Sequence, residues 1–407
     1  MPLQPSTSTS TPVNSSRRGA LGLLAVLICA TAIGAVNLAA LQMVAARLGS
    51  YAPAALVVGA FSLGNALGLV AQGRLIDRYS ATRVLYPASA IFCLALSSAV
   101  FWHSTHQGVY LGLFLLAGLS LPAVTGVVRA AVPALYPERL HLRMYSAIAV
   151  TFQAGMACGP LAAAAFSPLR YSGYAFLVIA GLVAASTVCV AGLPRPTRPA
   201  AQLLASSPGQ PMRPPPARSG RTDPALLTRG YVTVLLGMAG FGISTGVIAV
   251  GVPAALDAAN PALVGVAFTA LAVGDLSSGM LYGSRNWPGT LRQHLLLSLV
   301  LAACAAALLA SLVSWPALAL CAMFLLGAMS TPAGIAMSAL LDITVPRSRL
   351  TVAYTSMIAT NLVAVSLGSA AAGMTVEAAG PTLSLVIAPL ALLGAACIVA
   401  MRRRSIS

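Results

Sequence analysis

Between residues 20 and 401 the chain is a succession of long apolar stretches, in which the few polar positions do not alternate with apolar ones. Each stretch has about the 20 residues that a helix needs to cross a bilayer. Lipid offers no partners for backbone N–H and C=O groups, so a spanning segment is a helix or a strand of a closed barrel. A barrel strand would alternate. The pattern therefore predicts an all-α integral membrane protein.

Twelve spanning helices are expected, six on each side of a central polar segment. The composition agrees, because 7% of the residues are charged and 58% are hydrophobic, whereas about a quarter are charged in a soluble domain. The expected spans are residues 20–46, 52–73, 84–102, 108–132, 145–167, 173–193, 230–253, 262–283, 293–314, 316–341, 352–374 and 380–401.

The central segment divides the chain into two halves. Residues 193–225 contain nine prolines and several arginines, a composition typical of an extended spacer that packs no core. An echo between Gly73 near Arg74 and Gly283 near Arg285 indicates an internal repeat with an offset of about 210 residues. We expect a disordered N-terminus (1–18), a first six-helix bundle (19–193), a Pro/Arg-rich linker (194–228), a second bundle (229–401) and a short tail (402–407).

The distribution of arginine predicts the orientation. The formal net charge is +16, and the chain has 23 arginines and no lysine. If the N-terminus is cytoplasmic, 20 of the 23 arginines fall on the cytoplasmic side, as the positive-inside rule requires. The charge is thereby explained without a nucleic-acid partner. Both termini are expected in the cytoplasm, and the lysine-free, alanine-rich composition suggests a bacterial inner membrane.

The loop after the second expected span carries a known string. Its sequence follows the order Gly-x-Leu-x-Asp-Arg-Tyr and resembles the signature of the major facilitator superfamily, with Ser80 where the family has glycine. The matching residues are Gly73, Leu75, Asp77, Arg78 and Tyr79, and Arg83 remains from the family's basic cluster. The resemblance implies two six-helix bundles that rock about a substrate site near the middle of the membrane.

In that family the loop is thought to act as a conformational latch. Gly73 would let two helix ends approach, and Asp77 would sit against a helix N-terminus, where negative charge is favoured. Arg78 and Arg83 would pair with carboxylates of the other half, and Arg129, in the fourth span, is a candidate partner for Asp77. The alternatives are a solvated basic loop and an Arg129 that reaches the headgroups.

A second string lies in the expected fifth span. Gly155, Gly159 and Pro160 resemble the Gly-x-x-x-Gly-Pro element of the superfamily's proton-driven export branch, although the family's further glycines are absent. Small residues four apart allow helices to cross closely, and proline bends a helix. The resemblance favours export over import.

Asp275 is the best candidate for proton coupling. It lies in the middle of the eighth expected span without a basic neighbour one turn away, and ionisable groups at that depth are costly and usually functional. The alternative is a structural carboxyl between the halves. Glu377, Asp342 and Asp257 lie at span edges and are interpreted as solvated charges.

Neutral polar residues within the spans are candidates for the substrate cavity. They are Asn37 and Gln42 in the first span, Gln153 in the fifth and Asn361 in the eleventh, with Asn65 in the second as a further possibility. Such residues also hydrogen-bond between helices without touching a ligand. Apart from Asp275 the interior is uncharged, which suggests a neutral or amphipathic substrate.

The sequence thus predicts a secondary transporter, most simply an exporter that exchanges protons for a small amphipathic molecule. The alternative is a facilitator or proton symporter for a metabolite. Gly242 to Gly246 fit Gly-x-Ser-x-Gly, but that motif needs a strand-to-helix turn and here lies within a span, so an enzyme is not expected. We expect no cofactor, no metal and a monomer whose partners are the substrate, protons and the lipid bilayer.

Overall fold

The computed structural model describes residues 12–102, 104, 106–166, 174–191, 193, 228–256, 261–284, 287–345 and 350–402. The expected linker, residues 194–228, lies outside the described residues except for Thr228. In the described part every regular element is a helix. The helices are α1 (Pro12–Leu48), α2 (Tyr51–Arg78), α3 (Ala81–Phe101), α4 (Gln107–Ser120), α5 (Val124–Leu135), α6 (Glu138–Phe166), α7 (Tyr174–Ala191), α9 (Arg229–Leu256), α10 (Pro261–Ser284), α11 (Leu291–Leu312), α12 (Pro316–Thr344), α13 (Leu350–Ala379), α14 (Pro381–Leu385) and α15 (Ile387–Met401).

These helices account for the expected spans. Within the described residues, eleven segments are long and apolar enough to cross a membrane, and α7 supplies a shorter apolar helix over Tyr174–Val190. The prediction of a helical membrane protein is confirmed. The start of the chain differs from expectation, because α1 begins at Pro12, inside the segment 1–18 that was expected to be disordered.

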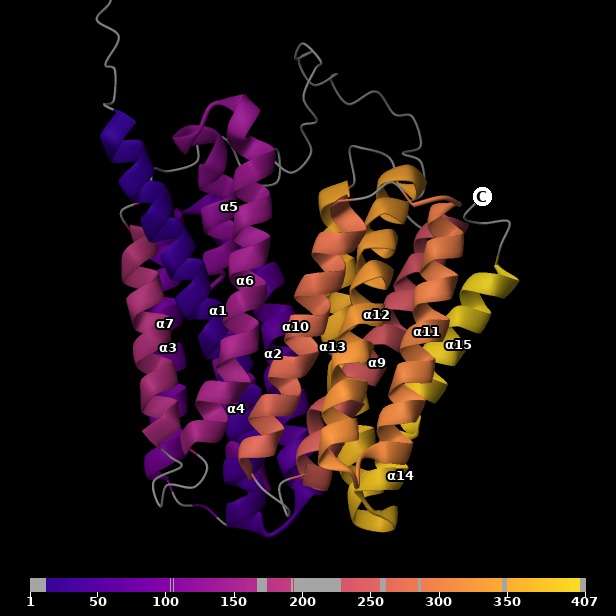
Figure 1. Ribbon diagram of the computed structural model, residues 1–407. Helices are drawn as coiled ribbons and strands as arrows, with labels where there is room; N and C mark the ends of the chain where they lie inside the picture. The colour runs from indigo at the N-terminus through magenta and orange to yellow at the C-terminus, as the bar shows by residue number, and fades with distance from the viewer. Residues whose placement is uncertain are drawn as a thin grey trace, which may run out of the picture.

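The helices form two bundles, α1–α7 and α9–α15 (Figure 1). In the first bundle α1 packs against α6 and α7, and α2 packs against α4. In the second bundle α9 packs against α13 and α15, and α12 packs against α10 and α11. We call the end at which α1, α3, α6 and α9 begin the linker end, which is at the top of Figure 1, and the other end the opposite end. In Figure 1 the ribbons of the two bundles lie farther apart at the linker end.

Two of the expected spans are broken, which corrects the continuous helices expected over 108–132 and 380–401. The first is divided between α4 and α5 by Leu121 to Ala123, and the second between α14 and α15 at Val386. A proline weakens the helix at both breaks, because it has no N–H to donate to the carbonyl four residues earlier. Pro122 lies inside the first break, and Pro389 deprives Leu385, the last residue of α14, of a donor.

The internal repeat is visible in how helices cross within each bundle. Gly64 of α2 and Gly118 of α4 lie where these two helices meet backbone to backbone. Gly274 of α10 and Gly327 of α12 do the same in the second bundle. The corresponding glycines are offset by 210 and 209 residues, so the two bundles are copies of one packing scheme.

Candidate functional site

The two bundles touch each other near the opposite end. Gly373 of α13 lies against Ala55 of α2, and Gly265 of α10 lies against Ala164 of α6. The internal repeat relates these two contacts, because Gly265 follows Ala55 by 210 residues and Gly373 follows Ala164 by 209 residues. The hydroxyl of Ser50, just before α2, also donates a hydrogen bond to Glu377 of α13.

The next contacts toward the linker end follow the same scheme. Gly59 of α2 faces Ser366 of α13, because a Cβ on Gly59 would lie 3.0 Å from the carbonyl oxygen of Ser366. Thr269 of α10 donates a 3.4 Å hydrogen bond to the carbonyl oxygen of Ala157 of α6. Four helices, α2, α6, α10 and α13, therefore build the boundary between the bundles, and the contacts described here lie in the halves of these helices nearer the opposite end.

Each of the four helices carries one polar residue that lies one to two turns from these contacts, on the side of the linker end. Asn65 and Asp275 lie six residues beyond Gly59 and Thr269, Gln153 lies four residues from Ala157, and Asn361 lies five residues from Ser366. At 1.5 Å per residue these separations are about 6–9 Å along the helix axes, all toward the linker end. The structure thus brings four predicted polar residues to one level, just inside the closed contacts between the bundles: Asn65, Gln153, Asp275 and Asn361.

Asp275 is held within its own bundle. Thr331 of α12 donates a 2.7 Å hydrogen bond to Oδ1 of Asp275, and the side chain is half-buried. The backbone N of Asp275 faces Gly327, which allows α10 and α12 to approach this closely. Asn65 occupies the equivalent position in the first bundle, next to Gly64 and facing Gly118. At this repeated position the second bundle therefore has a carboxyl, Asp275, where the first bundle has an amide, Asn65.

Three of the predicted cavity residues have buried atoms without a protein partner. They are Oδ1 of Asn37, Nε2 of Gln42 and Oδ1 of Asn361. Buried polar atoms in proteins are almost always hydrogen-bonded, so these atoms require a partner from solvent or from a bound molecule. Oδ1 of Asn361 lies beside Gly242 of α9. Gln153 is half-buried on α6.

Most of the predicted latch loop is helical, because Gly73 to Arg78 belong to the end of α2 and Arg83 to the first turn of α3. This corrects the loop expected after residue 73, although most of its described side chains are exposed. A Cβ on Gly73 would meet no atom within 4 Å, and Arg78 and Arg83 are exposed. The guanidinium of Arg78 lies 5.6 Å from the ring centre of its neighbour Tyr79. The side chain of Asp77 lies outside the described residues, so its pairing with Arg129, which is exposed on α5, stays a prediction.

Ser80, the residue that departs from the family pattern, has a local role. Its hydroxyl accepts a 3.4 Å hydrogen bond from the backbone N–H of Arg83 and caps the N-terminus of α3. Serine is among the preferred residues at this position. The substitution of serine for the family's glycine therefore leaves α3 with a defined start.

The Gly155–Gly159 pair of α6 lies where this helix crosses α1. A Cβ on Gly159 would lie 2.6 Å from the carbonyl oxygen of Thr31, and one on Gly155 would lie 2.7 Å from that of Leu27. The carbonyl of Pro160 faces Gly265 of α10, in the other bundle. The string therefore sits where α1, α6 and α10 meet.

Two residues that matter to the structure were missed by sequence reasoning. Arg47 was not singled out, but its guanidinium donates to the carbonyls of Ala99 at 2.6 Å and Val100 at 2.9 Å and to the hydroxyl of Tyr110 at 3.1 Å. Gln72 of α2 was not singled out, yet it is buried in the break of the fourth span. For both residues, the available signal in the sequence was a polar side chain close to the end of an expected span.

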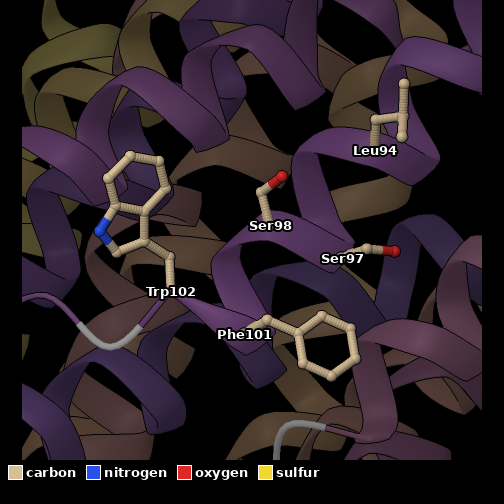
Figure 2. A pocket seen from close by; sticks show the side chains of 5 residues that line it. All are labelled: Leu94, Ser97, Ser98, Phe101 and Trp102. Carbon is tan, nitrogen blue, oxygen red and sulfur yellow. The ribbon is translucent and has the colours of Figure 1, made fainter.

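A shallow depression on α3 lies away from this boundary (Figure 2). Its lining comes from α3 and the residue that caps it: Leu94, Ser97, Ser98, Phe101 and Trp102. Phe101 and Trp102 are 70% and 62% exposed, and α3 packs with its other side on α4 and α7 of its own bundle. An aromatic side chain at a span end is typical of the membrane interface, so this depression reads as part of the lipid-facing surface.

The possible enzyme motif is part of a transmembrane helix. Ser244 is buried within α9, and Gly242 and Gly246 pack against α13. Gly-x-Ser-x-Gly activates a serine only on an exposed turn between a strand and a helix. The motif is therefore a helix-packing element here.

Two repeated six-helix bundles, with polar residues at one level on the helices where the bundles meet, are the architecture of a membrane transporter. The sequence matches the Major Facilitator Superfamily over residues 22–356. The chain belongs to this superfamily, whose members are transporters and not enzymes.

Relatives with known names show what similar chains do. Over 127 residues the chain is 32% identical to the 4-hydroxybenzoate transporter PcaK of Pseudomonas aeruginosa, a match that spans 31% of this chain and 28% of that protein. The fold is similar to that of a bacterial homologue of the human lysosomal transporter Spinster, solved in an inward-facing, unoccupied conformation, with a TM-score of 0.71, 14% identity and 98% of both chains covered. It is also similar to a mutant of the nucleoside transporter NupG, with a TM-score of 0.69, 13% identity and coverage of 96% of this chain and all of that one.

Proposed function

We propose that this chain couples the transport of a small organic molecule to protons through Asp275. The observation that carries the proposal is the position of this carboxyl, on a boundary helix at the level of Asn65, Gln153 and Asn361 and hydrogen-bonded to Thr331. A carboxyl near the middle of a bilayer is costly. A functional role, in which the carboxyl gains and loses a proton as the bundles move, explains why such a costly group is present.

The linker end is the cytoplasmic side in this proposal. Exposed arginines at helix ends gather there, among them Arg17, Arg83, Arg143 and Arg229, and the positive-inside rule places such residues in the cytoplasm. With the cytoplasm at the linker end, the contacts between the bundles near the opposite end correspond to an inward-facing conformation. We propose further that the protein acts as a monomer in a bacterial inner membrane. An exposed latch loop, with Gly73 free of neighbours, agrees with that state.

Efflux of an amphipathic molecule is the direction that the sequence favours, through the string Gly155, Gly159 and Pro160. Uptake with protons is the second candidate, and the similarity to a 4-hydroxybenzoate transporter favours it. Arg129, an exposed cation on α5, could balance the charge of an aromatic carboxylate in that case.

The direction can be tested in membrane vesicles of both orientations. Everted vesicles acidified by ATP hydrolysis should accumulate the substrate of a proton antiporter, and right-side-out vesicles should accumulate that of a symporter. Labelled 4-hydroxybenzoate, uridine and a cationic dye are suitable probes. Accumulation that ignores the proton gradient in both vesicle types would refute proton coupling.

A further inference from the structure

The fourth span is interrupted inside the membrane, and the interruption leaves backbone groups without helical partners. Leu121, Pro122 and Ala123 separate α4 from α5. Part of the backbone repairs itself locally, since Leu121 N donates to Gly118 O at 3.2 Å and Val124 N to Pro122 O at 2.8 Å. The carbonyls of Leu119 and Leu121 and the N–H of Ala123 still require partners, because lipid supplies none.

One side chain of α2 supplies all three partners. Nε2 of Gln72 donates to the carbonyls of Leu119 at 3.2 Å and Leu121 at 2.9 Å. Oε1 of Gln72 accepts from the N–H of Ala123 at 3.1 Å. The side chain is 4% exposed. An amide is suited to this task, because it carries both donors and an acceptor.

The approach of α2 to the break depends on its sequence spacing. Gly64, Gly68 and Gln72 are four residues apart and therefore share one face of the helix. The two glycines lie against the backbone of α4, Gly64 beside Leu115 and Gly68 beside Leu119. Gln72 comes one turn later, where the backbone of the span opens, and directly precedes Gly73 of the latch loop.

The second bundle lacks this arrangement, although it repeats the proline. Pro332 follows Pro122 by 210 residues, yet α12 runs unbroken from Pro316 to Thr344. The position equivalent to Gln72 is Tyr282, whose hydroxyl pairs with Nδ1 of His294 on α11 at 2.8 Å. Proline alone therefore does not break the span, and the break coincides with the glutamine.

We propose that Gln72 is a positioning residue of the transport cycle, which stabilises the conformation seen here by holding the fourth span in its broken form. In this role it links the backbone of α4 and α5 to the end of α2 that enters the latch loop. Loss of its hydrogen bonds shifts the population toward the conformation in which the opposite end is open.

The test uses a cysteine at a contact between the bundles, the half-buried position of Ser366, which the alternative conformation exposes further. Ser366→Cys is placed in a background free of the seven native cysteines, and its rate of modification by a maleimide is measured on purified protein in detergent, without substrate. Gln72→Leu should raise the rate by about tenfold, the change expected for losing buried hydrogen bonds. The matched control is Gln107→Ala at the exposed start of α4, which should leave the rate unchanged.

Pro122→Ala shows whether Gln72 acts through the break. This change restores an N–H within the span, so the double variant P122A/Q72L should label no faster than P122A alone. If Gln72→Leu alone fails to insert into the membrane, the comparison of P122A/Q72L with P122A still tests the proposal. The repaired span no longer needs the glutamine, so the double variant should insert. Two results would overturn the proposal: an unchanged labelling rate in Gln72→Leu, or effects of the two substitutions that simply add.

Discussion

The hydroxyl of Ser50 donates a hydrogen bond to Glu377, across the boundary between the two bundles. The same hydroxyl oxygen accepts a 3.2 Å hydrogen bond from the N–H of Ala52 and so caps α2. Glu377 is exposed, as expected for a charge at a span edge, but it is paired with Ser50 instead of being simply solvated. This pair joins the start of α2 to the last turn of α13 on the side where the bundles are closed.

Removal of this pair should favour the conformation that is open at the opposite end. Ser50→Ala loses the bond to Glu377 and the cap on α2, a cap being worth about 1 kcal/mol. The rate of maleimide labelling at Ser366→Cys should rise several-fold, while Ser50→Thr, which keeps a hydroxyl, should label like the parent. Equal labelling of Ser50→Ala and the parent would show that the pair has no part in closing the bundles.

Arg47 should be a stabilising residue of the first bundle. Its guanidinium binds the carbonyls at the end of α3, where the helix dipole favours positive charge, and it lies 5.8 Å from the ring centre of Tyr110. Arg47→Ala should lower the free energy of unfolding by roughly 2–3 kcal/mol.

Thermal unfolding in detergent measures this effect. Arg83→Ala is the control, because that side chain is exposed in the α2–α3 region and should change stability little. If both alanine variants unfold at the temperature of the parent, the carbonyl contacts of Arg47 contribute nothing to stability.

The crossing of α1 and α6 should not tolerate a methyl group at Gly159. A Cβ there would lie 2.6 Å from the backbone N of Ala35 as well as from the carbonyl of Thr31, and backbone atoms cannot move aside cheaply. Gly159→Ala should destabilise the protein by about 1–3 kcal/mol. Gly181→Ala is the matched control, since a Cβ at Gly181 of α7 meets no atom within 4 Å. A stable Gly159→Ala variant, judged by gel filtration and thermal unfolding, would contradict this packing.

The sequence was sufficient for the fold because its strongest constraint is physical. Apolar stretches of bilayer length must be helices, and the proline-rich segment near Pro199 separates them into two groups. The offset of about 210 residues between Gly73 and Gly283 recurs in the structure in the pairs Gly64 with Gly274 and Pro122 with Pro332.

The functional details were harder to predict because a polar residue in an apolar stretch has several equivalent uses. Asn65 and Gln72 look alike in sequence, but Asn65 faces Gly118 of α4 within its own bundle, whereas Gln72 fills the break between α4 and α5. The fourth span was expected to be continuous, yet it is broken at Pro122, whereas the copy Pro332 leaves α12 intact. The outcome depends on which side chain the neighbouring helix offers, and a single sequence does not show that pairing.

The measurement that tests the central claim most directly is proton movement in liposomes containing the purified protein and an internal pH dye. Candidate substrates such as 4-hydroxybenzoate, nucleosides and cationic dyes are added in turn, and the parent is compared with Asp275→Asn. The control is Glu377→Gln, which removes an exposed carboxyl near the end of α13 but keeps an oxygen that accepts the hydrogen bond of Ser50, so it should keep proton movement. Substrate-dependent proton flux that disappears in Asp275→Asn while the substrate still binds would be the predicted result. Substrate transport without proton flux, equal in the parent and Asp275→Asn, would contradict the account and leave Asp275 a structural partner of Thr331.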